Sequence, residues 1–154
     1  GLIEASLNAY GWTGPWATRR GFDSLVQMAC GIADAGRLWA KSDTPTPLPV
    51  QALDHATGYL MAAAILTSLT AAMQGTARNA RLSLARTAVL LMQNQQLVPG
   101  TLSLQPEMPD FGAGIEATPW GPARRLLPAL TLKGCPMAWK TPAAELGSAA
   151  ANWA

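Results

Sequence analysis

Apolar and polar residues alternate along the first part of the chain in patterns that predict strands and helices in turn. A short, mostly apolar run at residues 2–7 leads into NAYGWTGP, which predicts a strand followed by a loop. The segment FDSLVQMACGIADAG, residues 22–36, carries apolar residues at helical spacing. Ser24 and Gln27 stand in capping-box spacing there, and Gly36 is a stop signal. We therefore predict one amphipathic helix over this segment.

A second helix is predicted after a proline-rich linker at residues 41–49, KSDTPTPLP. This helix runs from about Ala52 to Gln74 and ends at Gly75. Its apolar residues lie almost all the way round, which predicts burial on both sides. A brief alternating segment at 81–85 predicts another strand, and residues 86–97 predict a further helix.

The order strand, helix, helix, strand, helix indicates an α/β fold with a mainly parallel sheet and long buried helices. The character of the chain changes near residue 98, after which prolines recur at short intervals. We expect residues 1–97 to form the α/β segment and residues 98–154 to form an extended, wrapping tail. The only strand we expect in that tail is ALTL, residues 129–132.

The charge content limits what the chain can be by itself. Hydrophobic residues make up 49% and charged residues only 13%, whereas soluble domains usually have about 25% charged residues. So little charge predicts a large covered surface, and we expect an incomplete piece of a larger protein or assembly rather than a self-sufficient domain. The net charge of +2 comes from scattered residues, which does not indicate nucleic-acid binding.

Cysteine and histidine usage excludes several further classes of site. Cys30 and Cys135 have no partner at metal-ligand spacing, and with a single histidine and no acidic cluster we expect no metal site. We interpret both cysteines as reduced thiols of a cytoplasmic protein.

The start of the chain lacks a signal-peptide pattern, and the apolar run at 59–73 falls short of about 20 residues, so we expect a buried helix and no membrane span.

Asp54, at the start of the long predicted helix, is the residue with the clearest candidate chemistry. Aspartate is among the best N-cap residues, and from the residues alone that structural interpretation is favoured. The alternative is a nucleophile, since a free carboxylate is ionised at neutral pH and can attack an activated acyl group. His55 follows directly, but neighbouring residues on a helix do not face one another, so we interpret His55 as incidental.

The order of three segments resembles family III CoA-transferases, the CaiB/BaiF family, which includes formyl-CoA and carnitine CoA-transferases and α-methylacyl-CoA racemases. The segments are SLNAYGWTGPWATRRGFDSLVQMACGI, PVQALDHATGYLMAAAILTSL and RLSLARTAVLL. Together they span roughly residues 2–92, and the proline-rich tail resembles the C-terminal wrapping segment of some members. The resemblance is to a C-terminal part of a longer member and implies a layer of a Rossmann-like parallel sheet.

The resemblance also implies an activity and its residues. In this family the acid of the pattern D-x-x-T-G, here Asp54 to Gly58, is the nucleophile that carries acyl and CoA groups in turn. Coenzyme A is then part of the substrate, and no permanently bound cofactor is expected. The turn after the first strand lies against CoA in relatives, so Asn8, Tyr10 and Gly11 are the expected CoA contacts. Backbone N–H groups near the helix start are expected to stabilise developing charge.

Two alternatives remain open at this point. Racemases of the same fold have a histidine just before the aspartate of the segment RRGFDSLVQ, where this chain has Phe22, so the transferase is favoured over a racemase. Relatives are longer and form interlocked dimers, which implies a homo-oligomer or a partner chain carrying the nucleotide-fold half. A non-catalytic assembly subunit that pairs with an active homologue is the other alternative.

Overall fold

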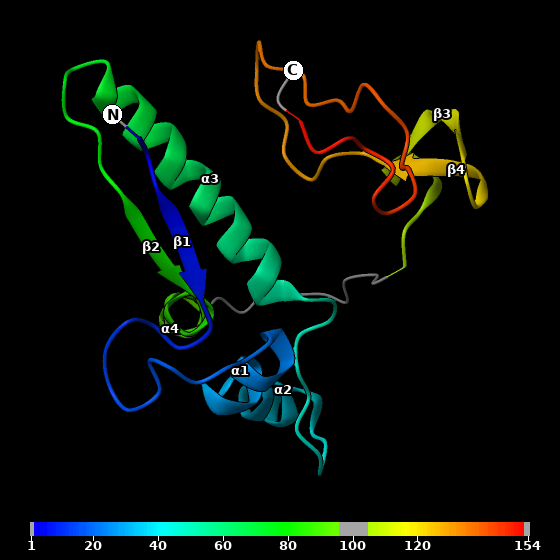
Figure 1. Cartoon of the computed structure of the whole chain (residues 1–154). Coiled ribbons are helices and arrows are strands. Elements are labelled where there is room, and N and C mark those ends of the chain that lie inside the picture. The colour runs from blue at the N-terminus through cyan, green and yellow to red at the C-terminus, as the bar shows by residue number, and fades with distance from the viewer. Residues whose placement is uncertain (1, 96–104, 153–154) are drawn as a thin grey trace. The chain divides into compact units, whose positions relative to one another are not determined.

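The computed structural model of the protein describes residues 2–95 and 105–152. The chain folds into two compact units, residues 1–99 and residues 100–154. The boundary predicted between residues 97 and 98 lies outside the described residues. The first unit has the order β1, α1, α2, α3, β2, α4, and the second contains a short 3₁₀ helix followed by β3 and β4. Figure 1 labels the four α-helices and the four strands.

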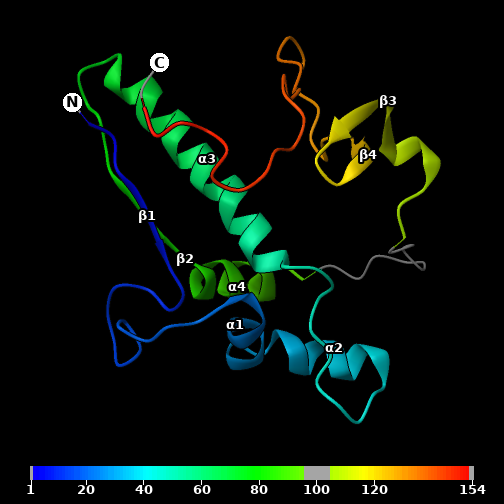
Figure 2. The same cartoon turned by 45° about the vertical axis from the view of Figure 1, so that its right-hand side comes forward.

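A parallel pair of strands is the frame of the first unit. Strand β1 (Ala5–Asn8) pairs with β2 (Ala80–Ser83), with Ala5 opposite Ala80 and Asn8 opposite Ser83. The predicted parallel pairing is confirmed. Helix α3 (Ala52–Ala72) runs alongside both strands, and α4 (Leu84–Gln93) begins directly where β2 ends (Figures 1 and 2). Both strands therefore end at the same edge of the sheet.

The prediction of one helix over residues 22–36 is wrong, because two helices occupy this part of the chain. Helix α1 covers Asp23–Ala29 and α2 covers Ile32–Ala40. Gly31 lies between them with φ of 86°, a left-handed conformation that ends one helix and that glycine adopts without steric cost. Ser24 and Gln27 form no capping box, since α1 begins at Asp23 and Phe22 holds the N-cap position without a side-chain cap.

Gly36 does not end a helix either, since it lies in the middle of α2. A β-carbon at this position would collide with the carbonyl oxygen of Thr46. The N–H of Thr46 donates to the carbonyl oxygen of Ala33 at 2.9 Å, so the proline-rich linker runs directly against α2. Gly36 therefore permits close packing of helix and linker.

The core of the first unit lies where the ends of its elements meet. Its buried apolar residues come from the end of β1, from α1, from α2 and from the first turns of α3 and α4; they are Ala9, Val26, Ile32, Leu53, Leu84 and Ala88. Leu53 and Val26 are completely buried. The core thus fixes the N-terminal end of α3, next to which Asp54 stands.

Helix α3 matches its predicted span closely, and within the described residues only one of its sides is covered. Its buried residues are Leu53, Thr57 and Ser68, while Leu66 and Met73 are 63% and 88% exposed. The strands and α4 cover only one side of the helix, so the remaining apolar side chains face outward. Among the described residues, no helix is both long and apolar enough to cross a membrane.

The second unit contains a hairpin that the prediction of an extended tail did not include. After a 3₁₀ helix at Met108–Asp110, strands β3 (Phe111–Thr118) and β4 (Gly121–Leu126) form an antiparallel hairpin. The glycine that begins β4 has φ of 107°, which suits the tight turn after Thr118. Residues 129–132 form no strand, and Leu132 only makes an isolated bridge to Cys135.

Candidate active site at the start of α3

The turn after β1 is held together by its own side chains. The Asn8 amide nitrogen donates to the Gly11 carbonyl oxygen at 2.7 Å, and its amide oxygen accepts from the Gly11 N–H at 2.8 Å. Gly11 has φ of 96°, so it needs the conformational freedom of glycine. The Tyr10 ring meets the edge of Trp16 at a centroid distance of 4.9 Å. Asn8 therefore shapes the turn, and both ends of its amide are already engaged there.

Asp54 is not the N-cap of α3. The N-cap position belongs to Gln51, which makes no side-chain capping bond, and Asp54 is the third helical residue. The structural interpretation favoured by the residues alone is therefore wrong. Asp54 is exposed, and within residues 2–95 and 105–152 no hydrogen bond or ion pair engages its carboxylate. The carboxylate is available for chemistry.

The cap of α3 comes instead from Asp23, at the start of α1. Its Oδ2 accepts hydrogen bonds from the backbone N–H groups of Leu53 at 2.7 Å and Asp54 at 3.0 Å. These are two of the N–H groups that a helix start leaves without a partner inside the helix. A negative charge at this end of a helix is also favourable to the helix dipole. Asp23 thus fixes the backbone that carries Asp54.

Asp23 is itself held by a buried neighbour on the same helix. Gln27, one turn later, donates from Nε2 to Asp23 Oδ1 at 2.6 Å, and its Oε1 accepts from the Leu48 N–H at 2.7 Å. Asp23 and Gln27 are 3% and 1% exposed. This Asp23–Gln27 pair joins α1, the proline-rich linker and α3. The buried polar side-chain atoms of this pair all have hydrogen-bond partners, as polar groups inside a protein usually do.

Thr57, the fourth residue of the D-x-x-T-G pattern, faces the interior. It is fully buried, and its hydroxyl lies 2.7 Å from that of Thr87 on α4. The Thr87 hydroxyl also lies 3.3 Å from the Ser83 carbonyl oxygen, to which it donates. Thr57 therefore ties α3 to α4. The next residue, Gly58, has open space where a β-carbon would stand.

A pocket of about 330 Å³ opens beside Asp54. The linker and the two helix starts form its walls, which comprise Phe22, Asp23, Ser24, Gln27, Pro47, Leu48, Val50, Gln51 and Asp54. Val50 has φ of 52°, an unusual conformation for a β-branched residue. The structure brings Asp54 and Phe22 to one pocket, whereas His55 does not line it.

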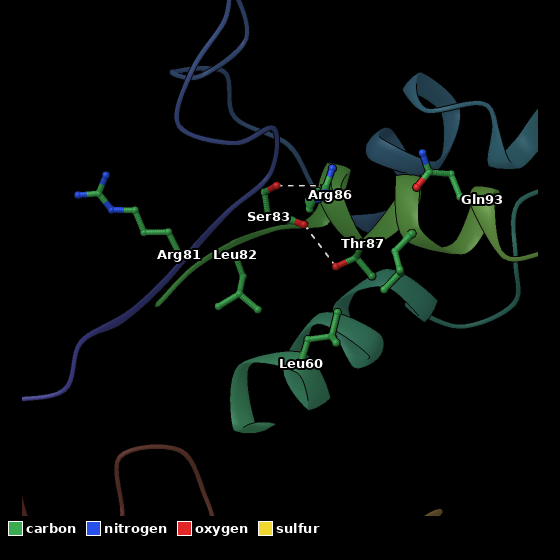
Figure 3. A pocket seen from close by; sticks show the side chains of 8 residues that line it. Leu60, Arg81, Leu82, Ser83, Arg86, Thr87 and Gln93 are labelled. Carbon is green, nitrogen blue, oxygen red and sulfur yellow. Dashed lines mark hydrogen bonds between the residues drawn. The ribbon is translucent and has the colours of Figure 1, made fainter. Parts of the chain in front are cut away.

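A second pocket, of about 320 Å³, lies further along the molecule (Figure 3). Its side chains come from β2 and α4, with Leu60 from α3 on the opposite wall. Arg81 and Arg86 are among the residues that line this pocket, and the Arg81 guanidinium lies over the Trp12 ring at 5.0 Å. Asn8, Tyr10 and Gly11 line neither pocket.

Sequence reasoning missed Asp23 and Gln27. The available signal was their i, i+4 spacing in the first turn of α1, which places the two side chains on one helix face. The expected stabilisation of charge by the first N–H groups of α3 is wrong for Leu53 and Asp54, because both already donate to Asp23. Within the described residues, His, Cys, Asp and Glu form no group of three able to hold a metal ion.

Comparison with known proteins gives the relatives of this chain. It is 33% identical over 121 residues to an acyl-CoA transferase of Fusarium pseudograminearum, a match that covers 78% of this chain and 24% of that protein. It is 35% identical over 68 residues to the probable fatty acyl-CoA transferase Rv3272 of Mycobacterium tuberculosis, with 44% of this chain and 17% of that protein covered.

Part of the chain also has a similar fold in a solved structure. The crystal structure of Rv3272 in its orthorhombic form superposes with a TM-score of 0.54 and 32% identity, covering 60% of this chain and 26% of that chain. The present chain therefore spans about a quarter or less of the length of these relatives. The sequence profile of CoA-transferase family III matches residues 1–119. The chain belongs to CoA-transferase family III.

Proposed function

We propose that this chain carries the nucleophile of a CoA-transferase, which moves CoA from an acyl-CoA to a carboxylic acid through Asp54. The observation that carries the proposal is the position of Asp54. Its carboxylate is exposed at the mouth of a pocket, and the structural task of capping α3 is done by Asp23. Family membership supports the same chemistry.

The first half of the reaction places CoA on the protein. An Asp54 carboxylate oxygen attacks the thioester carbonyl carbon, a C–O bond forms, and the C–S bond breaks as CoA leaves as its thiolate. The thiolate then attacks Cγ of Asp54 in the resulting mixed anhydride. This step forms an aspartyl-CoA thioester and releases the donor acid as a carboxylate. No proton is gained or lost in either step.

The second half is the same sequence in reverse with a different acid. The acceptor carboxylate attacks Cγ of Asp54, and CoA thiolate leaves again. The thiolate then attacks the acyl carbon of the acceptor in the new anhydride, which gives the acceptor acyl-CoA and restores the Asp54 carboxylate. Asp23 keeps the helix start in place throughout, because its bonds to the N–H groups of Leu53 and Asp54 do not involve the reacting atoms.

Phe22 supports a transferase over a racemase. A two-base racemase needs a second proton carrier facing the first, and the residue at this wall of the pocket is an aromatic side chain without a titratable group. The exposed His55 does not line the pocket. Proton abstraction between two opposed bases is therefore not supported here.

The remaining parts of the proposal concern binding and assembly. Tyr10 and Gly11 would contact CoA, with Asn8 fixing the turn through its two bonds to Gly11. The exposed apolar residues of α3 support a homo-oligomer or a partner chain that carries the nucleotide-fold half. We place the protein in the cytoplasm, where Cys30 and Cys135 remain free thiols.

The test is the intact mass of the protein in its native assembly after incubation with acyl-CoAs, beside an Asp54→Asn variant. We expect an acyl or CoA adduct that maps to Asp54 and is absent from the variant. An Asp34→Asn variant is the matched control, since Asp34 is an exposed helical carboxylate that lines neither pocket. Acyl-CoA binding without any adduct would overturn Asp54 as the nucleophile and favour a non-catalytic assembly subunit.

A further inference from the structure

The polar groups in the floor of the pocket beside Asp54 are already engaged with one another. Both oxygens of Asp23 accept hydrogen bonds, and the amide of Gln27 both donates and accepts. A ligand that enters the pocket therefore gains little from hydrogen bonds to these two side chains. Besides the exposed polar residues Ser24 and Gln51, a ligand can contact three apolar side chains of the pocket. Phe22, Leu48 and Val50 are 68%, 42% and 72% exposed.

The charges at this pocket have one sign. Among the described residues that line it there is no Lys, Arg or His, while Asp23 and Asp54 are both acidic. A second carboxylate on a substrate would be repelled by these two groups and would lose its hydration without gaining a cation. Two arginines line the other pocket instead, Arg81 on β2 and Arg86 on α4 (Figure 3).

Val50 is placed at the wall in spite of its backbone conformation. A β-branched residue at φ of 52° is strained, by about 1–3 kcal/mol for such positions in general. Glycine or asparagine would adopt this conformation more readily. The strained residue stands four positions before Asp54 and presents its isopropyl group at the pocket. Strain of this kind is retained where surrounding structure and function require it.

We infer that the pocket formed by Phe22, Leu48 and Val50 receives the acyl chain that is transferred through Asp54, and that it selects uncharged apolar acyl groups against acyl groups with a second carboxylate. This inference rests on the proposed function of Asp54 and adds the substrate class. The volume of about 330 Å³ lies at the lower end of the range for small-molecule sites, which suits a short acyl chain.

The test compares butyryl-CoA with succinyl-CoA, whose acyl chains have the same number of carbons and differ in the terminal carboxylate. The protein in its native assembly is incubated with each thioester, and the rate of adduct formation at Asp54 is followed by intact mass. We expect butyryl-CoA to react at least about tenfold faster than succinyl-CoA. The reason is that the terminal carboxylate of the succinyl group must lose water beside two like charges, which costs free energy. Equal rates, or a faster reaction of succinyl-CoA, would overturn the inference.

Two variants at one position separate charge from shape. Val50→Lys places a cation at the wall, whereas Val50→Met supplies an uncharged side chain of similar reach, and both remove the β-branch. We expect Val50→Lys to raise the succinyl-to-butyryl rate ratio about tenfold or more and Val50→Met to leave it close to that of the unmodified protein. A ratio that stays unchanged in Val50→Lys would show that Val50 does not contact the acyl chain, and an equal change in both variants would overturn selection by charge.

The proposed function and this inference fail in different ways. If Asp54 is not the nucleophile, no thioester gives an adduct that Asp54→Asn removes, and both proposals are wrong. If only the substrate class is wrong, adducts at Asp54 form with both thioesters at similar rates. We expect the two Val50 variants to melt close to the temperature of the unmodified protein, because neither new side chain is β-branched at this positive φ. Unchanged melting temperatures exclude misfolding as the cause of a changed ratio.

Discussion

Replacing Asp23 with alanine tests the claim that the start of α3 is fixed from another helix. The substitution removes the acceptor of the Leu53 and Asp54 N–H groups and leaves the Gln27 amide nitrogen without its 2.6 Å partner. Loss of a helix cap costs about 1 kcal/mol, and a buried donor left without a partner costs about 1–3 kcal/mol. Because the contributions are not independent, we expect the free energy of unfolding to fall by about 3 kcal/mol.

Urea unfolding of the protein in its native assembly measures this change. With a denaturant dependence of about 2 kcal/mol per M, the midpoint should fall by about 1.5 M. Asp34→Ala is the control, because Asp34 forms only an exposed pair with Arg37 at 2.8 Å and such pairs contribute about 0–1 kcal/mol.

Asp23→Asn should give an intermediate result for a geometric reason. Its amide oxygen can still accept from the N–H groups of α3, as asparagine does at helix caps. Its amide nitrogen then points at the amide nitrogen of Gln27, and two donors face each other. The reasoning is refuted if Asp23→Ala is no more destabilising than Asp34→Ala.

Two further predictions concern the thiols and the hairpin. Burial raises the pKa of the Cys30 thiol, so less thiolate is present at neutral pH. Iodoacetamide should therefore modify Cys30 more slowly than the exposed Cys135. A mass-spectrometric time course of labelling checks this, and faster labelling of Cys30 would contradict it. The hydrogen bonds from Arg125 to Glu116, both at 2.7 Å, lower the pKa of the Glu116 carboxyl. A lowered folded-state pKa means that the pair stabilises β3 and β4 fully above the ordinary glutamate pKa of about 4.3 and loses this effect as the pH falls through the lower value. The protection factors of the amides in residues 111–126, which compare each exchange rate with the intrinsic rate at the same pH, should therefore fall in acid. Glu116→Gln should lower these protection factors already at neutral pH, where unchanged protection would refute the role of the pair.

Elements with a regular pattern of apolar residues were predictable from the sequence. The parallel pair of strands and the long helix α3 follow from such patterns, and their positions agree with the structure within a few residues. The division of residues 22–40 into two helices was missed, since Gly31 breaks a pattern that continues on both sides. A single glycine can be tolerated inside a helix, so its position alone does not decide.

The hairpin was missed because prolines were given too much weight. Pro119 lies in the turn between the two strands, and Pro122 lies in β4 itself. A proline removes one backbone donor, which a two-stranded ribbon tolerates because each strand has a free edge. The diagonal pair of Glu116 and Arg125 across the strands adds to the hairpin, and the register places Glu116 opposite Ala123.

The candidate nucleophile could be found from the sequence, but its surroundings could not. Asp54 follows from the D-x-x-T-G pattern, whereas the capping role of Asp23 depends on a contact between distant parts of the chain. The same contact reverses the interpretation of Asp54, since a helix start needs its cap from somewhere. Only the arrangement in space shows which of the two aspartates supplies it.

The distance along the chain between Asp23 and the helix it caps has a consequence for folding. The bonded residues are 30 and 31 positions apart, so this contact closes a loop whose entropy must be overcome before the contact forms. Helical turns in the middle of α3 can form from local interactions alone, but the first turn gains its partners only when α1 docks. We therefore expect the geometry around Asp54 to be completed late in folding, so that a partly folded chain presents the carboxylate without the ordered backbone that carries it.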